Sequence, residues 1–262
     1  MWRWAMVVLL VSCAHAPVSP QPRVVEVMLQ HVKRDGPNHR HMLRLAKLSA
    51  RLAKAEGADA RLVEAAALLH DAAKEDGQGA PFERFCTHHL QAAALARQSL
   101  PGLGFSADET ARVAAAIEQH MGPLGDNEEL HAPRFMSGFC KREFPRPATV
   151  EAKVLFDLDM LDLMTVEGVV KVVTSRQRNS EFAKESLRDS ALTGADSSWK
   201  SVVDARQVLL TPTGQRCGDE VQRHTRAFLG QVPFETVTTV EAFEQAAHAW
   251  LTSHALPACV AP

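Results

Sequence analysis

Residues 67–76, "ALLHDAAKED", give the strongest indication of the fold. The apolar stripe that leads into it has helical spacing and predicts the buried face of an α-helix; its members are Leu62, Val63, Ala66 and Leu69. His70 continues this stripe and Asp71 follows directly, rotated by about 100° on an ideal helix. Burying an imidazole and a carboxylate beside one apolar stripe is costly unless they pair or bind a metal. The stretch therefore predicts a helix whose end holds His70 and Asp71 either as a buried pair or as metal ligands.

The same helical period continues on both sides of this stretch, and no run alternates as a β-strand does. The sequence therefore predicts an all-α protein. The expected helices cover residues 24–32, 39–56 with Gly57 as a stop, a segment capped by Asp59, 82–100, a segment from the Ser106–Glu109 capping box to His120, 150–173, 199–210, 218–229, and 240–254 behind a Thr238–Glu241 capping box.

Residues 121–149 interrupt the helical pattern with four prolines and three glycines. This is long for a connection inside a compact domain and predicts a lid or a binding loop. Within it, His131 and Arg134 are candidates to touch an anionic group, although loop residues of these types are usually solvated.

The composition is that of a soluble globular protein, because 46% of the 262 residues are hydrophobic and 23% are charged. The net charge is -2, and no block of five like charges occurs, so the composition disfavours binding to a nucleic-acid polymer. The composition is still compatible with binding of a small anionic substrate.

The first residues, "MWRWAMVVLLVSCAHAPVSPQ", have a basic Arg3, an apolar run over 5–11, and Cys13. This pattern resembles a bacterial lipoprotein signal and predicts a lipidated Cys13, membrane attachment and a location in the cell envelope. The alternatives are a buried N-terminal helix or a wrongly assigned start codon, in which case the protein would be cytoplasmic.

The other four cysteines include no C-x-x-C pair, which excludes zinc-finger and thioredoxin-like sites; they are Cys86, Cys140, Cys217 and Cys259. Two disulfides are possible in an oxidising compartment, and the sequence leaves their formation and pairing open.

Several imidazoles and carboxylates could bind a metal: His41, His70, Asp71, His88, His89, His120, Asp157 and Asp159. Such a mixture suits Mn, Fe, Zn, Ni or Mg rather than an ion selected by thiolates. Each residue alone also has an ordinary explanation, since histidines at helix ends often serve as caps.

Three stretches together carry a resemblance to a known family: "HRHMLRLAKLSARLAKAEG" (39–57), "ALLHDAAK" (67–74) and "VEAKVLFDLDMLDLM" (150–164). In this order they resemble the HD-domain superfamily of metal-dependent phosphohydrolases. The resemblance spans about residues 39–164 and implies a compact helical bundle. We divide the chain into a lipoprotein-type signal and linker (1–22), an HD domain (23–175) and a helical extension that packs on it (176–262).

The resemblance implies that His41, His70, Asp71 and a distal Asp bind the principal metal. The family's Ala-Asp-x-Leu pattern stands here at residues 158–161, which points to Asp159, with Asp157 as the second choice.

Some branches of the family add two histidines and hold a second ion. Here His88 or its neighbour His89, with His120, could supply them, so the resemblance implies one or two divalent ions. The alternative is that these histidines cap helices or orient the metal ligands through hydrogen bonds.

The implied activity is hydrolysis of a phosphoester, in a nucleotide or another small phosphorylated compound, by metal-activated water. Asp71 would orient or deprotonate that water, and Lys74 could neutralise a phosphate charge. The alternatives are an HD-type di-iron oxygenase and a non-catalytic lipid-anchored envelope protein.

Overall fold

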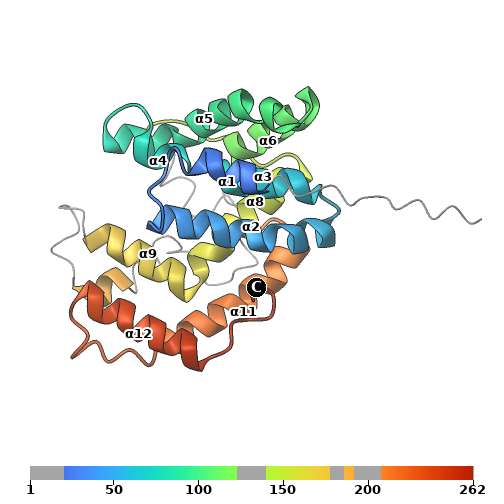
Figure 1. Ribbon diagram of the computed structural model, residues 1–262. Coiled ribbons are helices and arrows are strands. Elements are labelled where there is room, and N and C mark those ends of the chain that lie inside the picture. Colours follow the sequence, from blue (N-terminus) through green and yellow to red (C-terminus); the bar gives the residue numbers. More distant parts are fainter. Residues whose placement is uncertain (1–20, 123–139, 178–185, 192–207, 262) are drawn as a thin grey trace, which may run out of the picture.

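The structure is a computed structural model that describes residues 21–122, 140–177, 186–191 and 208–261. All regular structure in these ranges is helical, which confirms the predicted all-α class (Figure 1). The predicted signal, most of the 121–149 loop with His131 and Arg134, and most of the predicted 199–210 helix lie outside the described residues.

The helices, in chain order, are α1 (Gln21–Met28), α2 (Pro37–Glu56), α3 (Ala60–Leu69), α4 (Ala73–Asp76), α5 (Pro81–Ser99), α6 (Ala107–Gln119), α8 (Val150–Met164), α9 (Val166–Gln177), α11 (Pro212–Leu229) and α12 (Val240–Ser253). A 3-10 turn at Pro101–Leu103 follows α5, and residues 187–191 form a short helical segment.

Local signals set the ends of the N-terminal helices as the sequence predicts. Gly57 ends α2 with a φ of 73°, the left-handed region that favours glycine. The Asp59 side chain caps α3, and Ser106 and Glu109 form the reciprocal capping box of α6.

The C-terminal helices differ from the prediction in three places. The expected helix over 150–173 is broken at Thr165, whose hydroxyl donates to the Asp162 carbonyl and accepts from the Gly168 N–H, so that it caps α9. Helix α11 begins six residues before the predicted 218, where Thr211 supplies the cap. The predicted capping box of α12 is wrong, because its cap is Thr239.

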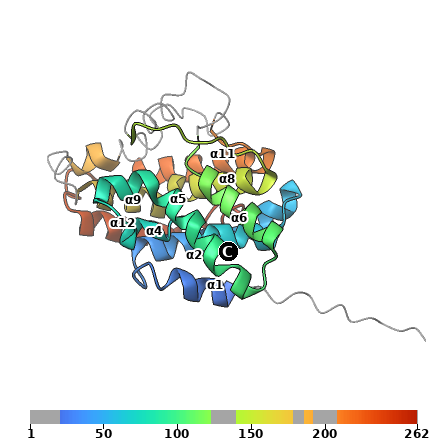
Figure 2. The ribbon, with the colours of Figure 1, turned by 90° about the horizontal axis from the view of Figure 1, so that it is seen from above.

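The central layer consists of α2, α3, α6 and α8, which pack against one another around the larger hydrophobic core. Helix α5 packs on α6, and α1 packs on α3 (Figures 1 and 2). This arrangement brings the end of α3, where the His70–Asp71 doublet lies, between α2, α5, α6 and α8.

The C-terminal helices pack on the other side of α2 in Figure 1. Helix α11 contacts α8 and α2, and α12 contacts α9. A second hydrophobic core is formed by α9, α11, α12 and the 187–191 segment. It includes Val166, Val169, Val173, Leu187, Phe228, Phe243 and Trp250. The predicted domain boundary at residue 175 therefore falls inside α9, whose side chains belong to this second core.

Two disulfides tie distant segments together. Cys86 in α5 is bonded to Cys140 before α8, and Cys217 in α11 is bonded to Cys259 near the C-terminus. Within the described ranges, the structure has no helix that is both long and apolar enough to span a membrane.

Candidate metal centre

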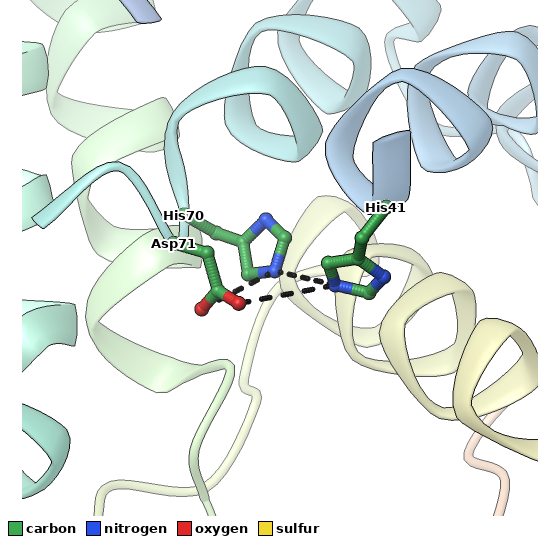
Figure 3. A group of neighbouring side chains, drawn as sticks. All are labelled: His41, His70 and Asp71. Carbon is green, nitrogen blue, oxygen red and sulfur yellow. Dashed lines mark hydrogen bonds and ion pairs between the residues drawn. The ribbon is translucent and has the colours of Figure 1, made fainter. Parts of the chain in front are cut away.

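Six buried side chains from five parts of the bundle converge at the end of α3. They are His41 (α2), His70 and Asp71 (the end of α3 and the turn after it), His88 (α5), His120 (the end of α6) and Asp159 (α8). Figure 3 shows three of them, His41, His70 and Asp71, pointing toward one another. The structure thus brings together the six first-choice ligands and leaves out the two alternatives, Asp157 and His89.

Each histidine is oriented by a hydrogen bond at its Nδ1 atom. In His70, His88 and His120, Nδ1 donates to the backbone carbonyl three residues earlier, at 2.9, 2.6 and 2.6 Å. A carbonyl only accepts, so we assign the proton of these rings to Nδ1. In the neutral ring, Nε2 then carries a lone pair and faces the site.

These Nε2 atoms lie close to one another in two pairs. The His41 and His70 Nε2 atoms are 3.3 Å apart, and those of His88 and His120 are 3.2 Å apart. With the tautomers fixed by Nδ1, the second pair has no proton to share and is not a hydrogen bond. Facing lone pairs in a buried site fit a cation that both of them ligate.

Asp71 lies between the two pairs. Its Oδ1 is 3.2 Å from the His88 Nε2 and 3.5 Å from the His70 Nε2, and its Oδ2 is 3.9 Å from the His41 Nε2. Although fully buried, Oδ1 accepts no hydrogen bond of good geometry. An unsatisfied buried carboxylate oxygen is costly, so this atom fits a metal ligand.

The ligand atoms form three overlapping groups, within each of which they lie within 4.8 Å of one another. Two of the groups share Asp71: one has His41 and His70, and the other has His88 and His120. The third group, His70, His120 and Asp159, spans the two pairs of histidines. Asp159 joins the first group, because its Oδ1 lies 3.1 Å from the His41 Nε2. The donor set fits two divalent ions of the imidazole- and carboxylate-binding class.

Asp157, the second choice for the distal ligand, faces away from the site. Its carboxylate accepts hydrogen bonds from the backbone N–H groups of Leu210 and Thr211 and from the Thr211 hydroxyl. Asp157 therefore joins α8 to the segment before α11.

Asp162, which was not among the residues predicted from the sequence, holds His41 in place. Its Oδ2 lies 2.6 Å from the His41 Nδ1, and Arg44 donates two hydrogen bonds to the carboxylate from Nε and Nη2. Such a carboxylate fixes the tautomer of a metal-binding histidine and raises its basicity. The sequence feature that could have pointed to Asp162 is its spacing, because it follows Asp159 by three residues and so lies on the same helical face.

Two lysines border the same centre. The Lys74 ammonium donates to Asp71 Oδ2 at 2.7 Å, as expected for a residue one turn after the doublet. Lys171 of α9, which the sequence analysis did not identify, has its Nζ 4.0 Å from the same oxygen.

His89, the alternative to His88, lies beside the site rather than in it. Its ring is 5.2 Å from that of Phe144, and it belongs to none of the groups of ligand atoms. Of these two adjacent histidines, His88 is therefore the candidate metal ligand.

Burial keeps two of the proposed histidine ligands, His70 and His88, neutral. It lowers the pKa of His70 to about 3 and that of His88 to about 4, with the Lys74 ammonium adding to the effect on His88. Burial opposes ionisation of Asp71, but Lys74 and His70 outweigh it and hold the pKa of this carboxyl well below its ordinary range. Neutral imidazoles and ionised carboxylates are the forms that bind metals.

The metal-free protein is expected to lose stability as the pH falls from 6.5 toward 4. Unfolded histidine takes up a proton near pH 6.5, whereas folded His70 and His88 resist protonation down to about pH 3 and 4. Each contributes a slope of about 1.4 kcal/mol per pH unit in that window. Asp157, whose pKa burial raises to about 7, opposes part of it. Urea unfolding of the chelated protein at several pH values measures the slope of the free energy of unfolding against pH. This slope should become shallower in His88→Gln, and an unchanged slope would contradict the assignment of His88 as a neutral buried imidazole.

Asp157→Asn is expected to destabilise the protein without loss of metal. Asparagine keeps one acceptor oxygen and turns an amide donor toward the N–H groups that Asp157 now binds, which costs about 1–3 kcal/mol. Denaturant unfolding measures the loss of stability, and elemental analysis measures the metal content. Loss of metal in this variant alone, with Asp159→Asn retaining it, would reverse the assignment of the distal ligand.

The sequence and the fold were compared with those of known proteins. The family model of the HD domain matches residues 38–164. The fold is similar to the crystal structure of a Lactobacillus plantarum protein, with a TM-score of 0.50 and 19% identity over 81% of this chain and 94% of that one. A predicted HD superfamily hydrolase from an uncultured Thermotogales bacterium aligns with a TM-score of 0.48 and 18% identity over 80% of this chain and 89% of that one. The comparison with curated proteins found no significant match.

The all-α bundle and its converging imidazoles and carboxylates are those of a metal-binding HD domain. The chain contains a domain of the HD-domain superfamily, which residues 38–164 form.

Proposed function

We propose that the protein hydrolyses the phosphoester of a small phosphorylated compound, such as a nucleotide, with two divalent ions in the centre described above. The observation that carries the proposal is the shared position of Asp71 between two pairs of facing Nε2 atoms. Two adjoining sites of this kind suit a displacement at phosphorus, which needs positive charge near both the attacking and the leaving oxygen.

Bound divalent ions would lower the pKa of a water and polarise the phosphoryl oxygens. The protein's own side chains and carbonyls would position the ligands and balance the charge of the centre. The carbonyls behind His70, His88 and His120 fix the three rings, and the Asp71 carboxylate lies between the two pairs of histidines, with Oδ1 near both His88 and His70.

Asp71 is also the residue placed to orient the attacking water. Its Oδ1 has no hydrogen-bond donor, so it can accept one from a water that enters the centre. Lys74 holds Oδ2 at 2.7 Å, which keeps the carboxylate ionised and directs the free oxygen inward.

We also propose that the protein is exported and attached to a membrane through lipidated Cys13. The signal-like first residues support this, and so do the two disulfides, since such bonds persist in oxidising compartments. Metabolic labelling with a fatty acid should mark the wild type and leave Cys13→Ser unlabelled; unlabelled wild type would contradict lipid attachment.

A panel of phosphomonoesters, nucleotides and phosphodiesters, assayed with Mn, Fe, Ni, Zn and Mg in turn, tests the activity. We expect phosphate release that chelation abolishes and added metal restores. The six-ligand set also suits the di-iron alternative, so oxygen consumption is followed in the iron-loaded samples. Metal-dependent oxygen consumption without phosphate release from any compound would replace our proposal with that alternative.

A further inference from the structure

We propose that Lys171 binds a phosphoryl oxygen of the substrate and forms, with Lys74, a two-lysine clamp at the metal centre. The inference rests on the proposed function and adds to it a substrate-binding residue from outside the matched HD region, since α9 lies beyond residue 164.

The position of Lys171 gives the first argument. Its side chain is 18% exposed, and its Nζ lies 4.0 Å from Asp71 Oδ2, the oxygen that Lys74 already binds at 2.7 Å. Among the described residues, Asp71 is the only acidic group within 4.0 Å of this ammonium. Lys171 therefore has a contact that is too long for a hydrogen bond and donors left for another acceptor.

Charge balance gives the second argument. Asp162 is neutralised by Arg44, so Asp71 and Asp159 are the carboxylates that face the ions. Two divalent ions would more than neutralise this pair of charges. The two ammonium groups then add to an excess of positive charge in a largely buried site, which favours binding of an anion.

The turn between α8 and α9 gives the third argument, because it fixes where Lys171 lies. A Cβ at Gly168 would come 2.0 Å from the Asp162 carbonyl oxygen, so only glycine allows this approach of the two helices. The Thr165 hydroxyl closes the turn from the other side by binding the Asp162 carbonyl and the Gly168 N–H. Lys171 follows Gly168 by three residues and so lies on the same face of α9.

The test measures the affinity of inorganic phosphate for the metal-loaded full-length protein by calorimetry, which needs no turnover. Lys171→Met keeps the apolar stem and removes the charge, and we expect phosphate to bind on the order of 10- to 100-fold more weakly, as for a lost charged hydrogen bond. Lys171→Arg should recover most of the affinity. Both variants should retain the metal and the helical circular dichroism of the wild type.

The matched control is Lys153→Met, which makes the same change in charge at an exposed position of α8. It should bind phosphate as the wild type does. In steady-state assays, Lys171→Met should raise KM or the inhibition constant of phosphate, whereas a residue that only screens Asp71 would leave both unchanged.

The outcomes separate the two claims. Wild-type phosphate affinity in Lys171→Met, with metal retained and phosphoesters hydrolysed, overturns the clamp and leaves the proposed function intact. A metal-loaded wild type that neither binds phosphate nor hydrolyses any phosphoester contradicts the proposed function and the clamp with it.

Discussion

Asp71→Ala is expected to lose bound metal and at least about 100-fold in kcat/KM for any phosphoester the wild type hydrolyses, the lower end of the contribution of a positioned acid–base group. Asp71 belongs to both groups that contain a pair of facing histidines, so its removal takes a ligand from each of these two groups. Elemental analysis and steady-state kinetics give the two values.

Two variants make this result specific. Asp71→Asn keeps the volume of the side chain and should lose metal nearly as fully, which separates loss of charge from loss of packing. Asp108→Ala removes an exposed carboxylate from α6 and should keep metal and activity. Full metal content in both Asp71 variants would refute the assigned centre.

His88→Ala and His120→Ala are each expected to reduce the bound metal from two ions per chain to one. The facing Nε2 atoms of these two rings lie on the far side of Asp71 and would hold one ion, whereas His41, His70 and Asp159 remain for the other ion. Because both ions act on the phosphoryl group, activity should fall about 100-fold or more although one ion stays bound.

The adjacent His89 provides the control. It is as close in sequence as a control can be, yet its ring packs against Phe144. His89→Ala should therefore retain two ions even if it loses some stability. If His88→Ala keeps both ions, then His88 orients its neighbours and is not a ligand.

Much of the site could be predicted because its signals are local. The stripe that ends at His70 and Asp71 is readable from helical spacing, and the caps Asp59 and Ser106 act within four residues of their partners. The distal Asp159 and the pair His88 and His120 were predictable through the family resemblance, since spacing alone left Asp157 and His89 as competitors.

What the sequence analysis missed depends on contacts between distant segments. Asp162 matters because it meets His41, 121 residues earlier in the chain, and Arg44 beside it. Lys171 reaches Asp71 only because Thr165 and Gly168 break the long helical pattern and turn α9 toward the centre. Helical periodicity continues across that break and gives no sign of it.

The disulfides show the same limit. Four cysteines with no paired motif allow three pairings, and chain distance does not choose among them. Only the folded arrangement, in which α5 meets the segment before α8 and α11 meets the C-terminal segment, pairs Cys86 with Cys140 and Cys217 with Cys259.

Anomalous diffraction from crystals of the metal-loaded protein, recorded at the absorption edge of the metal that supports activity, shows whether Asp71 serves two divalent ions. We expect two peaks per chain, one bounded by His41, His70 and Asp159 and the other by His88 and His120, with the Asp71 carboxylate between them. A single peak, or peaks away from these residues, would refute the two-ion centre.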